Sequence, residues 1–199
     1  MNVRGTLAPC AGVVLLTAVL AGCDASGSAT AAGPKPPPPA PTESNPPGDI
    51  PDNQAYVPFA PPGTGFTVSV PEGWARTTTG PVTTFTDKLN RIEVSEHPAA
   101  KPPTPASVTA GDVPSLAGTV PAFAPGKATD VSRKAGAAVL YTYRGNSAAD
   151  PVTGKAVRDA FERYVFHHRG RDVVVTLSGP VNADNVDPWR TVTDSLRWR

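Results

Sequence analysis

The sequence predicts an α+β domain over residues 56–199, in which two main helices cover a mainly antiparallel sheet of about six or seven strands. Three observations support this fold class. Several short segments alternate apolar and polar residues, as half-buried strands do. Apolar residues at helical spacing occur twice, once in the middle of the domain and once at its end. The strands are joined by brief polar connections, so they form meanders, and the arrangement predicted is an α/β/α sandwich.

Three strands are predicted before the first helix. Apolar and polar side chains alternate from Phe66 to Val70, and Pro71 to Gly73 ends this strand just before Trp74. Residues 82–86 and 92–96 form two further strands, joined by a polar hairpin loop at 87–91.

The first helix is predicted from four apolar residues at the spacing of one helix face, Val113, Leu116, Ala117 and Val120. Asp112 is its expected N-cap. Pro114 then falls in the first turn, where proline is tolerated, and Pro121 ends the helix.

Four strands and a closing helix are predicted in the second half. The strands cover residues 128–133, 137–144, 157–168 and 173–178, with a loop at 146–155 and a tight turn at 169–172. The closing helix covers 184–198, where Asp184 or Asp187 is the expected cap and Pro188 suits an early helical position. Its buried face is formed by Trp189, Val192 and Leu196.

Two segments of this domain resemble the PsbP-like lipoproteins of actinobacteria. They run from Phe66 to Trp74 (FTVSVPEGW) and from Asp184 to Arg190 (DNVDPWR). That family shares its α/β/α sandwich with the PsbP extrinsic subunit of photosystem II and with a Ran-binding nuclear import factor. The resemblance spans about residues 60–199. It implies a non-enzymatic protein that works as an assembly factor, docking adaptor or envelope-protein partner, with no catalytic residues to carry over.

The first residues have the pattern of an export signal. Arg4 precedes an uncharged run at 7–22 that is rich in Leu, Val and Ala. A membrane-spanning helix needs roughly 20 apolar residues, so this run is short for one. It ends in Leu20-Ala21-Gly22-Cys23, which resembles the lipobox of bacterial lipoproteins. The alternatives are an ordinary secretory signal with an incidental cysteine, or a signal anchor.

The lipobox resemblance implies that residues 1–22 are a signal peptide and that Cys23 carries a diacylglyceryl anchor with a further acyl chain such as palmitate. The mature protein would then lie at the extracytoplasmic face of the cell membrane. Cys10 is the only other cysteine and falls inside the signal, so the mature domain is expected to hold neither a disulfide nor a free thiol.

Residues 23–55 are predicted to be a disordered tether. Nine of the thirty-two residues from 24 to 55 are proline, and Ile50 is the one apolar residue there that is larger than alanine. Such a segment buries too little surface to offset its ordering entropy and favours extended polyproline II. It is expected to lift the domain off the membrane.

The charges of the domain indicate which partners to expect. Residues 56–199 carry a net charge of +3 without a basic block, which argues against nucleic acid. Three cations in and near the 169–172 turn form the candidate partner surface, for an acidic protein or anionic lipid: Arg163, Arg169 and Arg171.

Catalytic, metal and cofactor sites are not expected. His167 and His168 are neighbours on one strand and point to opposite faces, and no carboxylate or thiol is placed to join His97 and His167 in a metal site. Asp184 and Asp187 fit helix capping better than acid–base chemistry. A G-x-S-x-G motif and a phosphate-binding loop are both missing from the sequence.

Two functions remain open at this point. The first is a membrane-anchored, non-enzymatic interaction or adaptor module of the cell envelope. The alternative is a carrier of lipid or of a small hydrophobic ligand, because a sheet covered by helices can open a cleft between its layers.

Overall fold

The computed structural model describes residues 46–149 and 153–199. The predicted signal peptide, Cys23 and the greater part of the predicted tether lie outside the described residues. Within them, no helix is long and apolar enough to cross a membrane.

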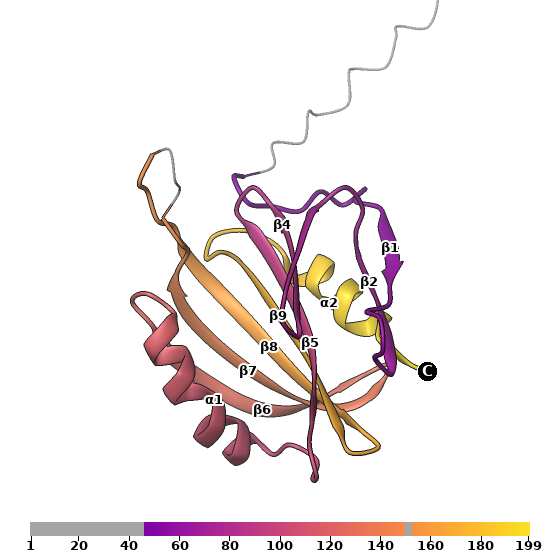
Figure 1. Ribbon diagram of the computed structural model, residues 1–199. Coiled ribbons are helices and arrows are strands. Elements are labelled where there is room, and N and C mark those ends of the chain that lie inside the picture. Colours follow the sequence, from indigo (N-terminus) through magenta and orange to yellow (C-terminus); the bar gives the residue numbers. More distant parts are fainter. Residues whose placement is uncertain (1–45, 150–152) are drawn as a thin grey trace, which may run out of the picture. The chain divides into compact units, whose positions relative to one another are not determined.

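A seven-stranded antiparallel sheet forms the centre of the fold (Figure 1). Its strand order is β3-β4-β5-β9-β8-β7-β6. The strands are β3 (Ala75–Thr79), β4 (Val82–Asp87), β5 (Asn90–Pro98), β6 (Ala124–Arg133), β7 (Gly136–Asn146), β8 (Arg158–His168) and β9 (Arg171–Pro180). A second sheet has the order β1-β2-β10, with β1 (Tyr56–Phe59), β2 (Phe66–Pro71) and β10 (Arg197–Trp198).

Both faces of the seven-stranded sheet are covered. Helix α1 (Pro105–Thr119) lies along β6 and β7 on one face, and helix α2 (Val186–Ser195) with the small sheet lies on the other (Figure 1). The larger core lies under α2 and β2 and contains Phe66, Val175 and Leu196. The smaller core lies under α1 and is built around Tyr141 and Tyr143. The predicted α+β class, with two helices and a mainly antiparallel sheet, is therefore confirmed.

The predicted strand at 66–70 exists as β2, but it does not belong to the main sheet. It pairs with β1 on one side and with β10 on the other. Strands β1, β3 and β10 are absent from the sequence prediction, because β1 contains Pro58, β3 lacks alternation and β10 is only two residues long.

Helix α1 begins seven residues earlier than the predicted cap. Thr104 is the N-cap and forms a capping box with Ser107, and Pro105 occupies the first helical position. Asp112 as N-cap is therefore wrong, and Pro114 lies inside the helix with its side chain exposed. Val113, Leu116 and Val120 pack on the smaller core as predicted, whereas Ala117 is exposed.

Helix α2 is shorter than predicted. It ends at Ser195, after which the chain turns into β10, so Trp198 belongs to a strand. The N-cap is Asn185, and no side chain of the described residues forms a capping hydrogen bond with α2, which corrects the expectation for Asp184 and Asp187. The predicted apolar face is confirmed, since Trp189, Val192 and Leu196 are all buried.

Residues 46–54, which we call the strap, pack on the folded unit although sequence analysis places them in the tether. Ile50 is 5% exposed and belongs to the larger core. The one large apolar residue of the predicted tether is thus the strap residue that is buried in the core.

Candidate functional site

The structure does not bring the three predicted partner-surface arginines together. Side chains alternate between the two faces of a strand. Arg163 lies on the face covered by α1, where its Nε donates to Asp112 Oδ2 at 2.6 Å and its Nη1 donates to Thr176 Oγ1 at 3.0 Å. It is partly buried and already paired, so it serves to join α1 to the sheet.

Arg171 lies on the opposite face of the sheet and is also paired. Its Nη1 donates to Glu96 Oε2 at 3.0 Å, and the Glu96 side chain is 4% exposed. Arg169 is exposed at the tip of the β8–β9 hairpin and has no ion pair or hydrogen bond with any other described residue. Of the three, Arg169 alone is free to meet a partner.

Two of the three histidines, His97 and His167, lie in a row with one carboxylate. Asp172 of β9 stands in register with His97 of β5 and with His167 of β8, so a carboxylate lies between them, contrary to the sequence expectation. Its Oδ1 is 2.7 Å from His167 Nδ1, whereas His97 Nε2 is 2.8 Å from Ser95 Oγ. Within residues 46–149 and 153–199 no three such side chains are placed to share a metal ion.

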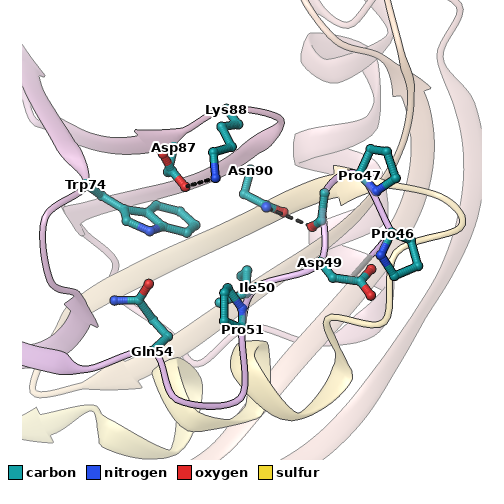
Figure 2. Close-up of a pocket in the computed structure, with 11 residues that line it drawn as sticks. Pro46, Pro47, Asp49, Ile50, Pro51, Gln54, Trp74, Asp87, Lys88 and Asn90 are labelled. Carbon is teal, nitrogen blue, oxygen red and sulfur yellow. Dashed lines mark hydrogen bonds and ion pairs between the residues drawn. The ribbon is translucent and has the colours of Figure 1, made fainter. Parts of the chain in front are cut away.

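A first cleft, the strap cleft, lies where the strap crosses the end of the sheet (Figure 2). It has a volume of about 360 Å³. Figure 2 shows Trp74 and Lys88 on one wall and Ile50 and Gln54 of the strap on the other. Its walls are therefore held in place by the attachment of the strap.

Two buried asparagines hold the strap. Asn185 accepts a hydrogen bond from Ile50 N at 2.8 Å through Oδ1 and donates through Nδ2 to Gly48 O at 3.0 Å. Asn90 Nδ2 donates to the same Gly48 oxygen at 2.8 Å. Because Asn185 and Asn90 are only 3% and 5% exposed, water competes little for the groups that form these hydrogen bonds.

A second cleft, the edge cleft, lies between the small sheet and the β3–β4 hairpin. Its volume of about 720 Å³ falls in the range of ligand sites. The residues along one wall come from β1 and the loop that follows it: Pro58, Phe59, Ala60, Pro61, Pro62 and Thr64. The other wall is formed mainly by Arg76, Thr78 and Thr83 of the hairpin.

Arg76 lies over an aromatic ring on the wall of the edge cleft. Its guanidinium carbon lies 5.8 Å from the centre of the Phe59 ring, and that ring packs edge-to-face on the buried Phe85 at 5.0 Å. No ion pair or hydrogen bond joins the Arg76 side chain to another described residue. Its fork of N–H donors is thus available for an anion.

Sequence analysis did not find the edge cleft. The available signal was the run Thr77 to Thr79 followed by Gly80-Pro81, because β-branched residues before a glycine-led two-residue turn are typical of a hairpin. The loop that forms the opposite wall joins β1 to β2, and no local pattern brings it beside β3.

One buried carboxylate lies away from both clefts. Asp159 of β8 is 3% exposed, and its Oδ1 has no hydrogen-bond partner among the described residues. Burial raises the pKa of Asp159 from 3.8 to about 6.

No family model matches this sequence, and no curated protein matches it as a relative. Solved structures do match. Cyanobacterial PsbP from Synechocystis sp. PCC 6803 aligns with 73% of this chain and 94% of its own, at 14% identity and a TM-score of 0.50. A protein of Bacteroides thetaiotaomicron aligns at 11% identity and a TM-score of 0.50, covering 71% of this chain and 48% of that one.

These similarities concern the fold alone. The chain has a PsbP-like fold. It spans about half of the length of the Bacteroides protein, as the 48% coverage states. LpqN of Mycobacterium tuberculosis, described as involved in cell envelope biogenesis, matches 73% of this chain and 91% of its own at 16% identity. Its TM-score of 0.41 is too low to support an argument.

Proposed function

We propose that this chain is an exported lipoprotein whose folded unit acts as a non-enzymatic interaction module at the extracytoplasmic face of the cell membrane. Anchoring is assigned to Cys23, which ends the lipobox-like segment Leu20 to Cys23. Two or more acyl chains on one residue make a durable anchor, whereas a single chain holds a protein only marginally.

The observation that carries the binding part of the proposal is the edge cleft. It is open to solvent, and its wall holds an arginine that lies over an aromatic ring and has no ion pair or hydrogen bond with the other described residues. A shared fold by itself does not give a function, so the PsbP-like fold adds only that such a module has a suitable scaffold.

The carrier function gains no specific support. A lipid site is expected to be a mostly apolar cavity between the layers. The two clefts lie at the surface instead, and the strap cleft has Asp87, Lys88 and Asn90 on its walls.

The anchoring part is tested by labelling cells that express the full chain with an alkyne-tagged fatty acid. We expect label on the chain and its recovery with the membrane fraction. Cys23→Ala should lose both, while Cys10→Ala, which changes the other cysteine, should lose neither. Labelling that persists in Cys23→Ala would refute the anchor.

The interaction part is tested by capturing the full chain from detergent-solubilised envelopes and identifying both proteins and lipids by mass spectrometry. One envelope protein enriched at a fixed ratio to the chain is the expected result. Enriched lipid without any protein, retained by Cys23→Ala, would refute the interaction module and favour the carrier.

A further inference from the structure

The two edges of the main sheet differ in how they are protected. Edge strand β6 contains Pro125 and has a register shift between Pro125 and Ala128, with Lys127 inside it. Proline, a bulge and lysine are the devices that stop another strand from pairing. The opposite edge strand, β3, has no proline, bulge or lysine; its one charged residue is Arg76, and all five of its residues are exposed.

The β3–β4 hairpin fixes which backbone groups of β3 are free. Its loop is the two residues Gly80 and Pro81, because Thr79 stands opposite Val82. Residues that flank a two-residue loop form a hydrogen-bonded pair, and such pairs alternate with unbonded ones. Arg76 and Thr78 are therefore the unbonded positions, and their N–H and C=O groups point away from β4.

The same two residues line the edge cleft. Arg76 and Thr78 place their side chains on the face of the sheet that carries the larger core, beside Phe59 and the prolines of the β1–β2 loop. A strand added to β3 would bond to the backbone of these residues. Every second side chain of that strand would enter the cleft.

The charged residues on the walls of the edge cleft indicate which kind of peptide it binds. Glu96 is the one carboxylate on its walls, and it is already engaged by Arg171 and by Gly65 N at 3.0 Å. Arg76 is the one cation on its walls and is unpaired within the described part of the chain. A carboxylate that enters beside Phe59 can accept hydrogen bonds from the unpaired guanidinium fork of Arg76.

We propose that β3 binds an extended acidic peptide segment of a partner protein by strand addition, with a carboxylate of that segment paired to Arg76. This inference rests on the proposed function as an interaction module and names the class of partner. The peptide contributes backbone hydrogen bonds to Arg76 and Thr78, small or β-branched side chains to the cleft, and one Asp or Glu to Arg76.

The test is a titration of the full chain, purified in detergent, with the synthetic peptide acetyl-Val-Thr-Val-Glu-Val-Thr-amide. Binding is followed by isothermal titration calorimetry, and the site is located by amide hydrogen exchange measured by NMR. We expect saturable binding, with exchange slowed at Arg76 and Thr78. Replacing the peptide Glu by Gln should weaken binding about tenfold, since a charge-assisted bond is lost.

Two variants of the chain separate charge from backbone pairing. Arg76→Gln should remove the preference for the Glu peptide over the Gln peptide, whereas Arg91→Gln, which removes an exposed arginine of β5, should leave it intact. Thr78→Pro removes an N–H that is not bonded to β4, together with the 3.2 Å hydrogen bond between Thr78 Oγ1 and Thr83 Oγ1. It should therefore abolish binding and lower the melting temperature only slightly. If Thr78→Pro unfolds the chain, a peptide N-methylated at alternate residues serves instead and should not bind.

Three results would overturn the proposal. They are equal affinity of the Glu and Gln peptides, protection located away from β3, and a β3 edge that pairs with a second copy, seen as a dimer that Thr78→Pro dissociates. The proposed function is tested separately from the strand-addition site. If Arg76→Gln and Thr78→Pro leave the capture of an envelope protein unaffected, the strand-addition site is refuted and the interaction module is retained.

Discussion

Asn185 and Asn90 are joined by a buried hydrogen bond, with Asn185 Nδ2 donating to Asn90 Oδ1 at 3.0 Å across 95 residues of sequence. Asn185 stands at the N-cap position of α2, where asparagine usually accepts a bond from the helix. Here its amide is used for the strap and for β5 instead. The start of α2, the start of β5 and the strap are thereby held together at one point.

Asn185→Ala is predicted to lower the free energy of unfolding by about 3 kcal/mol, because Ile50 N and Asn90 Oδ1 are left buried without this partner. Urea unfolding measures the change, and limited proteolysis should show faster cleavage within 46–54. The matched control is Asn53→Ala, an exposed strap residue, which should change stability by less than about 0.5 kcal/mol. A loss of less than about 1 kcal/mol in the free energy of unfolding for Asn185→Ala would contradict the role of Asn185 in holding the strap.

A substitution at Gly179 disturbs the hydrogen-bonded pair of Asn90 and Asn185 independently. A Cβ added there would lie 2.5 Å from Asn90 Oδ1 and 2.9 Å from Asn185 Nδ2, closer than such atoms approach. Gly179→Ala is therefore expected to loosen the strap as Asn185→Ala does. The double variant should cost less than the two single costs added, since both act on one network.

The sequence predicts elements that bury a periodic face and misses those that depend on distant partners. Trp189, Val192 and Leu196 define α2 by local spacing alone. Strand β10, in contrast, is two residues long and exists because Arg197 and Trp198 pair with Thr67 and Phe66 of β2. Helix α1 starts at the Thr104-Pro105 signal, whereas the prediction of a later start treats the internal Pro114 as a first-turn residue.

The candidate site was predictable in part. The alternation that separates His167 from His168 also separates Arg163 from Arg171, because Arg171 stands in register with His168. The same alternation rule places Arg163 and Arg171 on opposite faces of the sheet, so the three arginines do not form one surface. The ion pair of Arg163 with Asp112 was not accessible, since it depends on how α1 lies across the sheet.

Asp159 is predicted to make stability depend on pH. Its folded pKa of about 6 lies above the ordinary 3.8, so the folded state binds the proton more tightly than the unfolded state does. Stability from this group is therefore full below about pH 4 and is lost as the pH rises through 6. Burial of the charged form, with Oδ1 unpaired, is the cause.

Asp159→Asn should accordingly raise the free energy of unfolding by about 2 kcal/mol at pH 7.5 and by much less at pH 4, because the amide carries no charge. Urea unfolding at both pH values measures the difference. Asp130→Asn, at an exposed position of β6, serves as the control and should show no such pH dependence. An equal effect of Asp159→Asn at the two pH values would rule out the titration.

Asp112→Asn is predicted to weaken the attachment of α1. The ion pair with Arg163 is 2.6 Å long, and the two side chains are 27% and 22% exposed. Removing the carboxylate leaves a partly buried guanidinium without its anion, at a cost of about 1.5 kcal/mol. Arg163→Gln should cost a similar amount, and the double variant should cost little more than either single one. Additive costs would show that the pair contributes no coupling.

Arg169→Asn is predicted to change the stability of the fold and the binding of a partner in opposite directions. Arg169 has φ +47° and Gly170 has φ +78°, the two positive values that a type I′ turn requires, and asparagine adopts the first more easily than arginine. The substitution should therefore raise the free energy of unfolding by about 0.5 kcal/mol. If Arg169 contacts an acidic partner, the same variant should reduce capture of that partner in spite of its greater stability. Arg169→Lys, which keeps the charge, is the control and should retain capture. If Arg169→Asn captures the partner as well as the wild type does, the hairpin tip does not belong to the partner surface. The gain in stability would not compensate for an ion pair lost from the interface.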